Sequence, residues 1–189
     1  MKKKKLNLTK DEISFGTDGW RGILGVDFTL ERLLKVAAAA AQELAYVKEK
    51  KNNKIIIGYD RRFLAEEMAE AVASAVRGVD LVPLLSSSAL PTPSCSWGIV
   101  EENALGALVI TASHNPCEWL GLKIKGPFGG SVDSSFTDSV QKRLDAGGIS
   151  IPIEDETERV DFRKQHLLGI SQKFDIPMIS NGLRKLGVK

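Results

Sequence analysis

The chain has 189 residues, of which 43% are hydrophobic and 6% aromatic. This length fits one domain, or one domain with a tail, and is long enough to bury a sizeable core. The formal net charge is +2, from 26 lysines and arginines against 24 aspartates and glutamates. The lysine run at 2–5 supplies four positive charges, so the rest of the chain carries 22 against 24, a net charge of −2. The composition therefore disfavours nucleic-acid binding, which needs a basic face on the folded body.

The sequence carries no sign of a targeting or membrane segment. The residues after the lysine run are too polar for the apolar region of a signal peptide. No stretch approaches 18 apolar residues without a charge. Cys95 and Cys117 have no metal-type spacing and form no disulfide framework. We therefore expect a reduced, cytoplasmic protein.

The hydrophobic pattern alternates helices with buried strands. In chain order it predicts a helix over 29–50, a strand over 54–60, a helix over 63–77, a strand over 80–85, a short helix from 92 or 94 to 103, strands over 104–111 and 123–125, and helices over 133–144 and 158–174. This alternation predicts an α/β fold, a three-layer α/β/α sandwich with a mixed, mainly parallel sheet of about four strands. Gly147 and Gly148 mark a boundary, so we expect one domain over 1–148, and over 149–189 a helical tail that leads into a second domain absent from these residues.

A glycine-rich segment, FGTDGWRG (15–22), is the first candidate for binding an anion. Its three glycines allow a tight turn and a close approach of the backbone to a ligand. Arg21 adds a planar guanidinium that suits phosphate or carboxylate. An ordinary turn before the first helix, with Arg21 on the surface, would give the same pattern.

The second candidate is TASHNP (111–116), which follows an apolar strand. In open α/β sheets, ligands gather outside the carboxyl ends of strands. Ser113 lies at such a point, with His114 beside it and Pro116 fixing the turn. Its hydroxyl can act as a nucleophile, as a phosphate acceptor or as a capping group. The alternative is a structural turn with His114 on the surface.

A serine hydrolase is a poor match to this segment. Ser113 has no G-x-S-x-G context. The second histidine of the chain, His166, lies in the predicted C-terminal helix. We also expect the adjacent Ser113 and His114 side chains to diverge instead of forming a nucleophile–base hydrogen bond.

Two further segments carry cations. GYDRR (58–62) places two arginines directly after a strand, where they can bind an anion or form salt bridges at the start of a helix. Lys123 follows the serine by ten residues and can reach back to the same pocket or remain in solvent. The aspartates are too scattered to indicate a metal cage.

Four segments together resemble the motifs of one family. FGTDGWRG, GYDRR, PTP at 91–93 and ALVITASHNP at 107–116 occur in the order and at the spacing of the α-D-phosphohexomutases, which include phosphoglucomutases and phosphomannomutases. The resemblance covers about 13–144, and TASHNP after an apolar strand is a highly specific motif. The resemblance implies the N-terminal domain, domain I, of such an enzyme.

The resemblance implies that Ser113 is the active-site serine, phosphorylated in the working enzyme. The phosphoserine gives its phosphoryl group to a hydroxyl of a sugar phosphate. The resulting 1,6-bisphosphate reorients and returns its other phosphoryl group to the serine. The resemblance also implies catalytic roles for His114, Lys123 and Arg21, and substrate or phosphate binding by Thr17, Arg21, Asn115 and Lys123.

The family's cofactors and partners follow from the same resemblance. Mg²⁺ would bind a phosphoryl oxygen on Ser113 together with three aspartates of a D-G-D-x-D-R loop in a second domain. Glucose 1,6-bisphosphate would act as activator and phosphoryl donor. The expected partners are hexose phosphates and the remaining mutase domains in trans, with no nucleic acid and no membrane. FGTDGWRG and TASHNP favour the phosphoglucomutase/phosphomannomutase branch over the phosphoglucosamine branch.

The chain departs from the family pattern in two ways. Leu120-Gly121 stands where an Asn-Gly pair usually precedes the lysine, which affects the expected turn before Lys123. The 189 residues also contain no D-G-D-x-D-R loop, no sugar-reading G-E-x-S-G loop and no distal phosphate loop. We therefore expect little or no activity from the chain alone. The alternative is a stand-alone anion-binding or regulatory domain that keeps the fold without catalysis.

Overall fold

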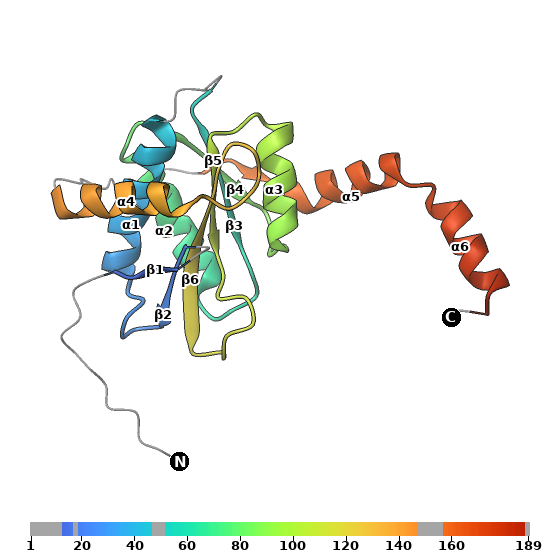
Figure 1. The fold of residues 1–189 in the computed structure, drawn as a ribbon, viewed down its shortest axis with the longest axis horizontal. Coiled ribbons are helices and arrows are strands. Elements are labelled where there is room, and N and C mark those ends of the chain that lie inside the picture. The colour runs from blue at the N-terminus through green and yellow to red at the C-terminus, as the bar shows by residue number, and fades with distance from the viewer. Residues whose placement is uncertain (1–12, 17–18, 47–51, 147–156, 188–189) are drawn as a thin grey trace, which may run out of the picture.

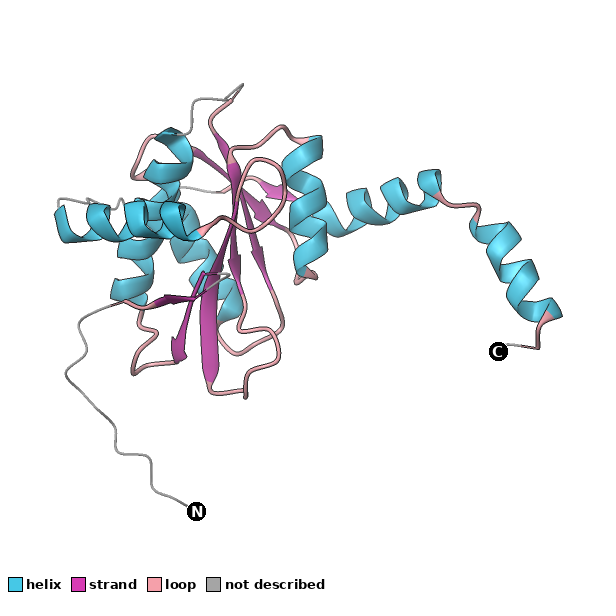
Figure 2. Cartoon of the chain, viewed as in Figure 1, coloured by secondary structure: helices cyan, strands magenta, loops and turns pink. Residues whose placement is uncertain are grey.

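The computed structural model describes residues 13–16, 19–46, 52–146 and 157–187 (Figures 1 and 2). Its strands are β1 (Phe15–Gly16), β2 (Gly19–Ile23), β3 (Lys54–Tyr59), β4 (Val82–Ser86), β5 (Gly106–Ile110), β6 (Trp119–Lys125) and β7 (Arg159–Val160). Its helices are α1 (Leu30–Tyr46), α2 (Ala65–Arg77), α3 (Thr92–Glu101), α4 (Ser134–Ala146), α5 (Phe162–Lys173) and α6 (Ile176–Lys185). Among these described residues no helix is long and apolar enough to cross a membrane.

The strands form one mixed sheet in the order β1-β2-β6-β5-β3-β4-β7. The run β5-β3-β4-β7 is parallel, whereas β1, β2 and β6 pair antiparallel with their neighbours. The mixed sheet predicted from the sequence is confirmed, but it has seven described strands instead of about four. The strands that the sequence did not predict are β1, β2 and β7. The first and last of them have two residues each, too few for a recognisable hydrophobic pattern.

Helices cover both faces of the sheet, as the predicted three-layer sandwich requires. Helices α1, α2 and α4 lie on one face, and α3 and α5 lie on the other (Figure 1). The alanine run 37–41 of α1 is completely buried. Its small side chains let α1 lie close to the sheet and to its neighbours α2 and α4. A separate apolar cluster under α3 includes Ile56, Val109 and Phe162.

The C-terminal segment returns to the sheet before it leaves the domain. β7 pairs with β4, with Arg159 opposite Leu85. Arg159 also forms salt bridges to Glu66 and Glu70 on α2. These contacts attach the segment around Arg159 to β4 and α2. The predicted boundary at 147–148 lies outside the described residues, so the division into 1–148 and 149–189 stays a prediction.

Helix α5 begins at Phe162, later than predicted, because 159–160 pair as a strand and Asp161 caps the helix through a 2.9 Å bond from the Lys164 amide. It packs on α3, where His166 Nδ1 lies 3.0 Å from Ser94 Oγ. Thus Ser94 contacts α5 and does not cap α3.

Helix α6 has a different environment. It extends away from the sandwich (Figure 1), and none of its residues is buried. Its exposed apolar side chains are Ile176, Met178, Ile179 and Leu183, with Leu186 directly after its end. Helical spacing places four of them, Ile176, Ile179, Leu183 and Leu186, on one side, which we call the α6 apolar face.

Candidate active site

The serine loop, residues 111–118, joins the buried strand β5 to β6. Its first residue, Thr111, is buried, and Thr111 Oγ1 accepts a 2.9 Å hydrogen bond from the Ser113 amide. Ser113 is exposed and has a φ of 56°, in the left-handed region. A non-glycine residue adopts this conformation only where the surroundings enforce it. The loop therefore presents the Ser113 hydroxyl at the carboxyl end of a core strand.

Arg62 contacts the serine loop through four main-chain carbonyls. Its Nη2 donates to the carbonyls of Ser113 (2.8 Å) and Asn115 (2.6 Å). Its Nη1 donates to the carbonyls of Pro116 (2.8 Å) and Trp119 (3.0 Å). A planar guanidinium can hold several carbonyls at fixed angles. Arg62, which lies in the β3–α2 connection, thus bonds the serine loop at Ser113 and at Trp119, directly after the loop.

Asp60 forms a salt bridge and a hydrogen bond with Arg62. Asp60 Oδ2 lies 3.4 Å from Arg62 Nε, and Asp60 Oδ1 accepts a 2.9 Å bond from the Arg62 amide. The Asp60 amide donates to the carbonyl of Ile110, the last residue of β5. Of the two functions that the sequence left open for GYDRR, Arg62 therefore has the salt bridge at a helix start. Nothing in the sequence beyond the Asp-Arg-Arg string indicated its contact with the serine loop.

Arg21 reaches the serine loop from the opposite side. It lies on β2, opposite Gly121 of β6, and its Nη1 donates a 3.0 Å hydrogen bond to Asn115 Oδ1. FGTDGWRG is thus part of a strand pair, not only a turn, and its arginine is half-buried. The structure brings together two of the predicted binding residues, Arg21 and Asn115.

Lys123 lies on β6 opposite Val109 of β5. Alternate residues of a strand share a face, so Lys123, Gly121 and Arg21 project on one side of the sheet. That side is the α3 side, because Val109 belongs to the apolar cluster under α3. Leu120 and Gly121 lie within a regular strand, so the unusual Leu-Gly pair forms no turn before Lys123.

His114 is exposed next to Ser113, with Nδ1 3.4 Å from Ser113 Oγ. The expectation that the two side chains diverge is therefore wrong. The contact is at the long end of the hydrogen-bond range. A catalytic base also needs a group that orients it, and His166 is engaged with Ser94. Thr17 lies outside the described residues.

No metal site is complete within the described part of the chain. It contains no group of three or more histidine, cysteine, aspartate or glutamate side chains that could hold a metal ion. Ser113, as a phosphoserine, would offer a single ligand. The residues present do not fit Mg²⁺ by themselves, and we derive no step through it.

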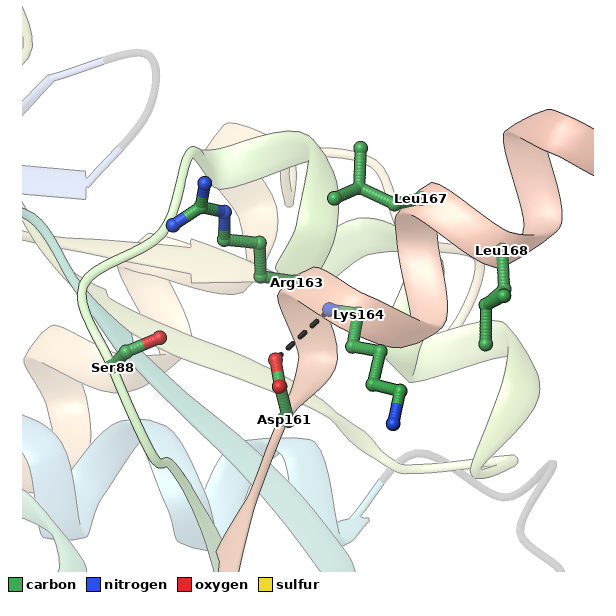
Figure 3. Close-up of a pocket in the computed structure, with 6 residues that line it drawn as sticks. All are labelled: Ser88, Asp161, Arg163, Lys164, Leu167 and Leu168. Atoms are coloured by element: carbon green, nitrogen blue, oxygen red, sulfur yellow. Dashed lines mark hydrogen bonds between the residues drawn. The ribbon is translucent and has the colours of Figure 1, made fainter.

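Two hollows lie away from the serine loop. One of about 360 Å³ lies at the start of α5 and is lined by Ser88, Asp161, Arg163, Lys164, Leu167 and Leu168 (Figure 3). Another of about 760 Å³ lies between the β1 segment and α4. Neither is lined by a residue of the serine loop, and Ser113 itself is exposed.

Comparison with known families gives a match to this site. Residues 12–148 match the family model for the phosphoglucomutase/phosphomannomutase alpha/beta/alpha domain I. The chain belongs to this family. The match includes the strand pair with Arg21, the Arg62 segment and the serine loop, which are the segments that carried the resemblance in the sequence.

Curated relatives include phosphoglucosamine mutases. The chain is 34% identical over 148 residues to that of Mycobacterium marinum, which covers 77% of this chain and 33% of the relative. It is 33% identical over 146 residues to that of Mycolicibacterium smegmatis, with 73% and 32% covered. The chain thus spans about a third of the length of these relatives.

Solved structures support the same fold. A protein of Thermus thermophilus described as a candidate phosphomannomutase matches with a TM-score of 0.78 and 28% identity, over 87% of this chain and 37% of that one. A phosphoglucomutase/phosphomannomutase family protein of Burkholderia thailandensis matches with a TM-score of 0.68 over 82% of this chain and 35% of that one. At 19% identity, this second likeness concerns the fold alone.

Proposed function

We propose that this chain supplies the phosphoryl-carrying serine of a phosphohexomutase. The observation that carries the proposal is the exposed Ser113, held in a left-handed conformation at the end of a core strand. A family match alone would not require an accessible hydroxyl there. The fixed loop supports group transfer, because phosphoryl transfer depends mainly on positioning and electrostatic stabilisation.

The proposed reaction moves one phosphoryl group at a time. The bond between phosphorus and the Ser113 oxygen breaks, and a bond forms between phosphorus and a hydroxyl oxygen of a hexose monophosphate. The proton of that hydroxyl ends on the serine oxygen, which leaves a hexose 1,6-bisphosphate. The bisphosphate then turns over and returns its other phosphoryl group to Ser113 by the same steps in reverse. Glucose 1,6-bisphosphate can therefore load the free serine.

The charges around the loop support this proposal. A phosphoserine carries a charge of about −1.5 to −2 at neutral pH and must meet a second phosphate. Arg21 is joined to the loop through Asn115, and Lys123 shares its sheet face. We propose that these two cations stabilise the transferring group, with Lys123 assisting the proton transfer. His114 and Thr17 remain proposed site residues.

We further propose that sugar and Mg²⁺ bind only when the rest of a mutase is present. The supporting observations are the exposure of Ser113 and the incomplete metal ligands in the described part of the chain. The α6 apolar face is the proposed contact surface for the rest of the mutase. Its exposed side chains lie in the segment that follows the family match, which ends at residue 148.

Complementation tests the proposal directly. The chain is mixed with the remaining domains of a related mutase, produced as a separate protein, and assayed with the 1-phosphates of glucose, mannose and glucosamine. We expect isomerisation that is lost in Ser113→Ala and retained in Ser134→Ala, an exposed serine at the start of α4. The preferred sugar distinguishes the branch that the motifs favour from the phosphoglucosamine mutases among the relatives.

Mass spectrometry of the loaded chain provides the second readout. Incubation with glucose 1,6-bisphosphate in the mixture should add about 80 Da to the peptide that contains Ser113. Absence of both isomerisation and label with a competent partner would refute the enzymatic proposal. Calorimetric binding of the bisphosphate that persists in that case would favour the stand-alone anion-binding domain.

A further inference from the structure

The Arg62 guanidinium is fully engaged by main-chain carbonyls and by Asp60. Four carbonyl oxygens, from Ser113 to Trp119, lie 2.6–3.0 Å from its two terminal nitrogens. Its remaining nitrogen faces Asp60 Oδ2. Arg62 therefore acts on the loop backbone and has no N–H group left to bind a substrate phosphate.

The carbonyl contacts fix the direction of the loop peptides. The described chain contains no cis peptide bond, and the C=O and N–H of a trans peptide point in opposite directions. Because the carbonyls of Ser113 and Pro116 point at Arg62, the amides of His114 and Cys117 point away from it. Outward main-chain N–H groups can donate hydrogen bonds to an anion.

We propose that Arg62 is the positioning residue that holds Ser113 ready for phosphoryl transfer, an inference that rests on the proposed function. Arg62 ties the left-handed Ser113 to the loop's end at Trp119, so that the hydroxyl and the outward amides keep one arrangement through loading and transfer. Asp60 couples this arrangement to the end of β5.

Lysine cannot replace this arginine. An ammonium group is a point charge on a flexible stem, whereas the contacts need a planar fork that spans four carbonyls. Arg62→Lys keeps the charge and removes the fork. Arg61→Lys is the matched control, since Arg61 is the neighbouring residue and is exposed.

The first measurement is amide hydrogen exchange in the 189-residue chain. The amides of Ser113, Asn115 and Trp119 are each bonded within the loop. We expect Arg62→Lys to speed their exchange by about tenfold or more, while core amides of β3 and β5 exchange as in the wild type. Arg61→Lys should leave all of them unchanged. Unchanged loop exchange in Arg62→Lys would overturn the proposal.

The second measurement is the rate at which Ser113 is phosphorylated in the complementation mixture. We expect Arg62→Ala to slow labelling by about 100-fold or more, with partial recovery on addition of millimolar guanidinium, which refills the space with the same planar cation. If Arg62→Ala slowed labelling through a general loss of folded structure, guanidinium would not restore the rate. Labelling of Arg62→Ala at the wild-type rate would also overturn the proposal.

The two measurements separate this proposal from the proposed function. A wild-type chain that is never labelled refutes the function, and the positioning role with it, even where exchange shows an ordered loop. If the wild-type chain is labelled, unchanged exchange in Arg62→Lys or labelling of Arg62→Ala at the wild-type rate refutes only the role of Arg62.

Discussion

Gly121 and Arg21 lie directly opposite each other on β6 and β2, and a Cβ atom at Gly121 would come within 2.8 Å of Arg21 Cγ. The same atom would lie 2.8 Å from the carbonyl oxygens of Trp20 and Thr111. The close approach of these segments therefore depends on a residue without a side chain. It places the Arg21 guanidinium where it bonds Asn115.

We expect Gly121→Ala to destabilise the chain by about 1–3 kcal/mol, because two of the three contacts are with backbone atoms that cannot rotate away. Urea unfolding measures this free energy. Gly182→Ala is the control, since a Cβ there meets nothing within 4 Å. Equal unfolding midpoints for Gly121→Ala and the wild type would contradict the packing described for this position.

The burial of Phe162 should supply much of the free energy that holds α5 on the domain. Phe162 is completely buried against α3, beside Gly98, whose Cβ would lie 2.7 Å from Phe162 Cδ1. We expect Phe162→Ala to cost about 3–5 kcal/mol of unfolding free energy. Phe174→Ala, at an exposed position after α5, should change it by less than about 0.5 kcal/mol. Similar values for the two variants would mean that the domain ends before α5.

Because Cys95 is buried, the free energy of unfolding should fall at high pH. Burial raises the pKa of the Cys95 thiol from 9.0 to about 12. Between these values the folded thiol keeps its proton while the unfolded thiol loses it, so the folded state binds more protons. The free energy of unfolding should therefore decrease as the pH rises from about 9 toward 12, by about 1.4 kcal/mol per pH unit.

The Cys95→Ala variant isolates this effect. Tyr59, whose pKa is also raised, mainly by burial, titrates in both proteins, so the difference between the two pH profiles reports the thiol. Native-state labelling with iodoacetamide gives a second readout, in which exposed Cys117 reacts and buried Cys95 does not. Parallel pH profiles for the variant and the wild type would contradict the raised pKa of the Cys95 thiol.

The α6 apolar face should bind hydrophobic probes. Leu183 is 44% exposed on α6. We expect Leu183→Lys to reduce the fluorescence of bound anilinonaphthalene sulfonate and to weaken complementation at least about tenfold, with an unchanged urea midpoint. Asn181→Lys adds the same charge at an exposed polar position of α6 and should do neither. Equal effects of the two lysines would indicate charge, not apolar contact.

Much of the fold follows from local pattern. β3 and β5 are continuous apolar runs, and α1 and α2 repeat apolar residues at helical spacing, so their sequences predict them closely. β7 is different, because two residues become a strand only through bonds to β4. Ser94 shows the same limit, since its partner, His166, lies 72 residues away.

The sequence by itself determined the family, the α/β class and the serine at the end of β5, because motifs and hydrophobic periods are local properties of the chain. The tertiary structure decided how that serine is held. Arg62 meets Ser113 across 51 residues, and Arg21 meets Asn115 across 94. Such contacts depend on the order and register of strands in the sheet, which no local pattern encodes. The length of 189 residues and the net charge of +2 limited the size of the fold and the classes of partner. Only the folded sheet brought two of the cations, Arg21 and Arg62, into contact with the serine loop.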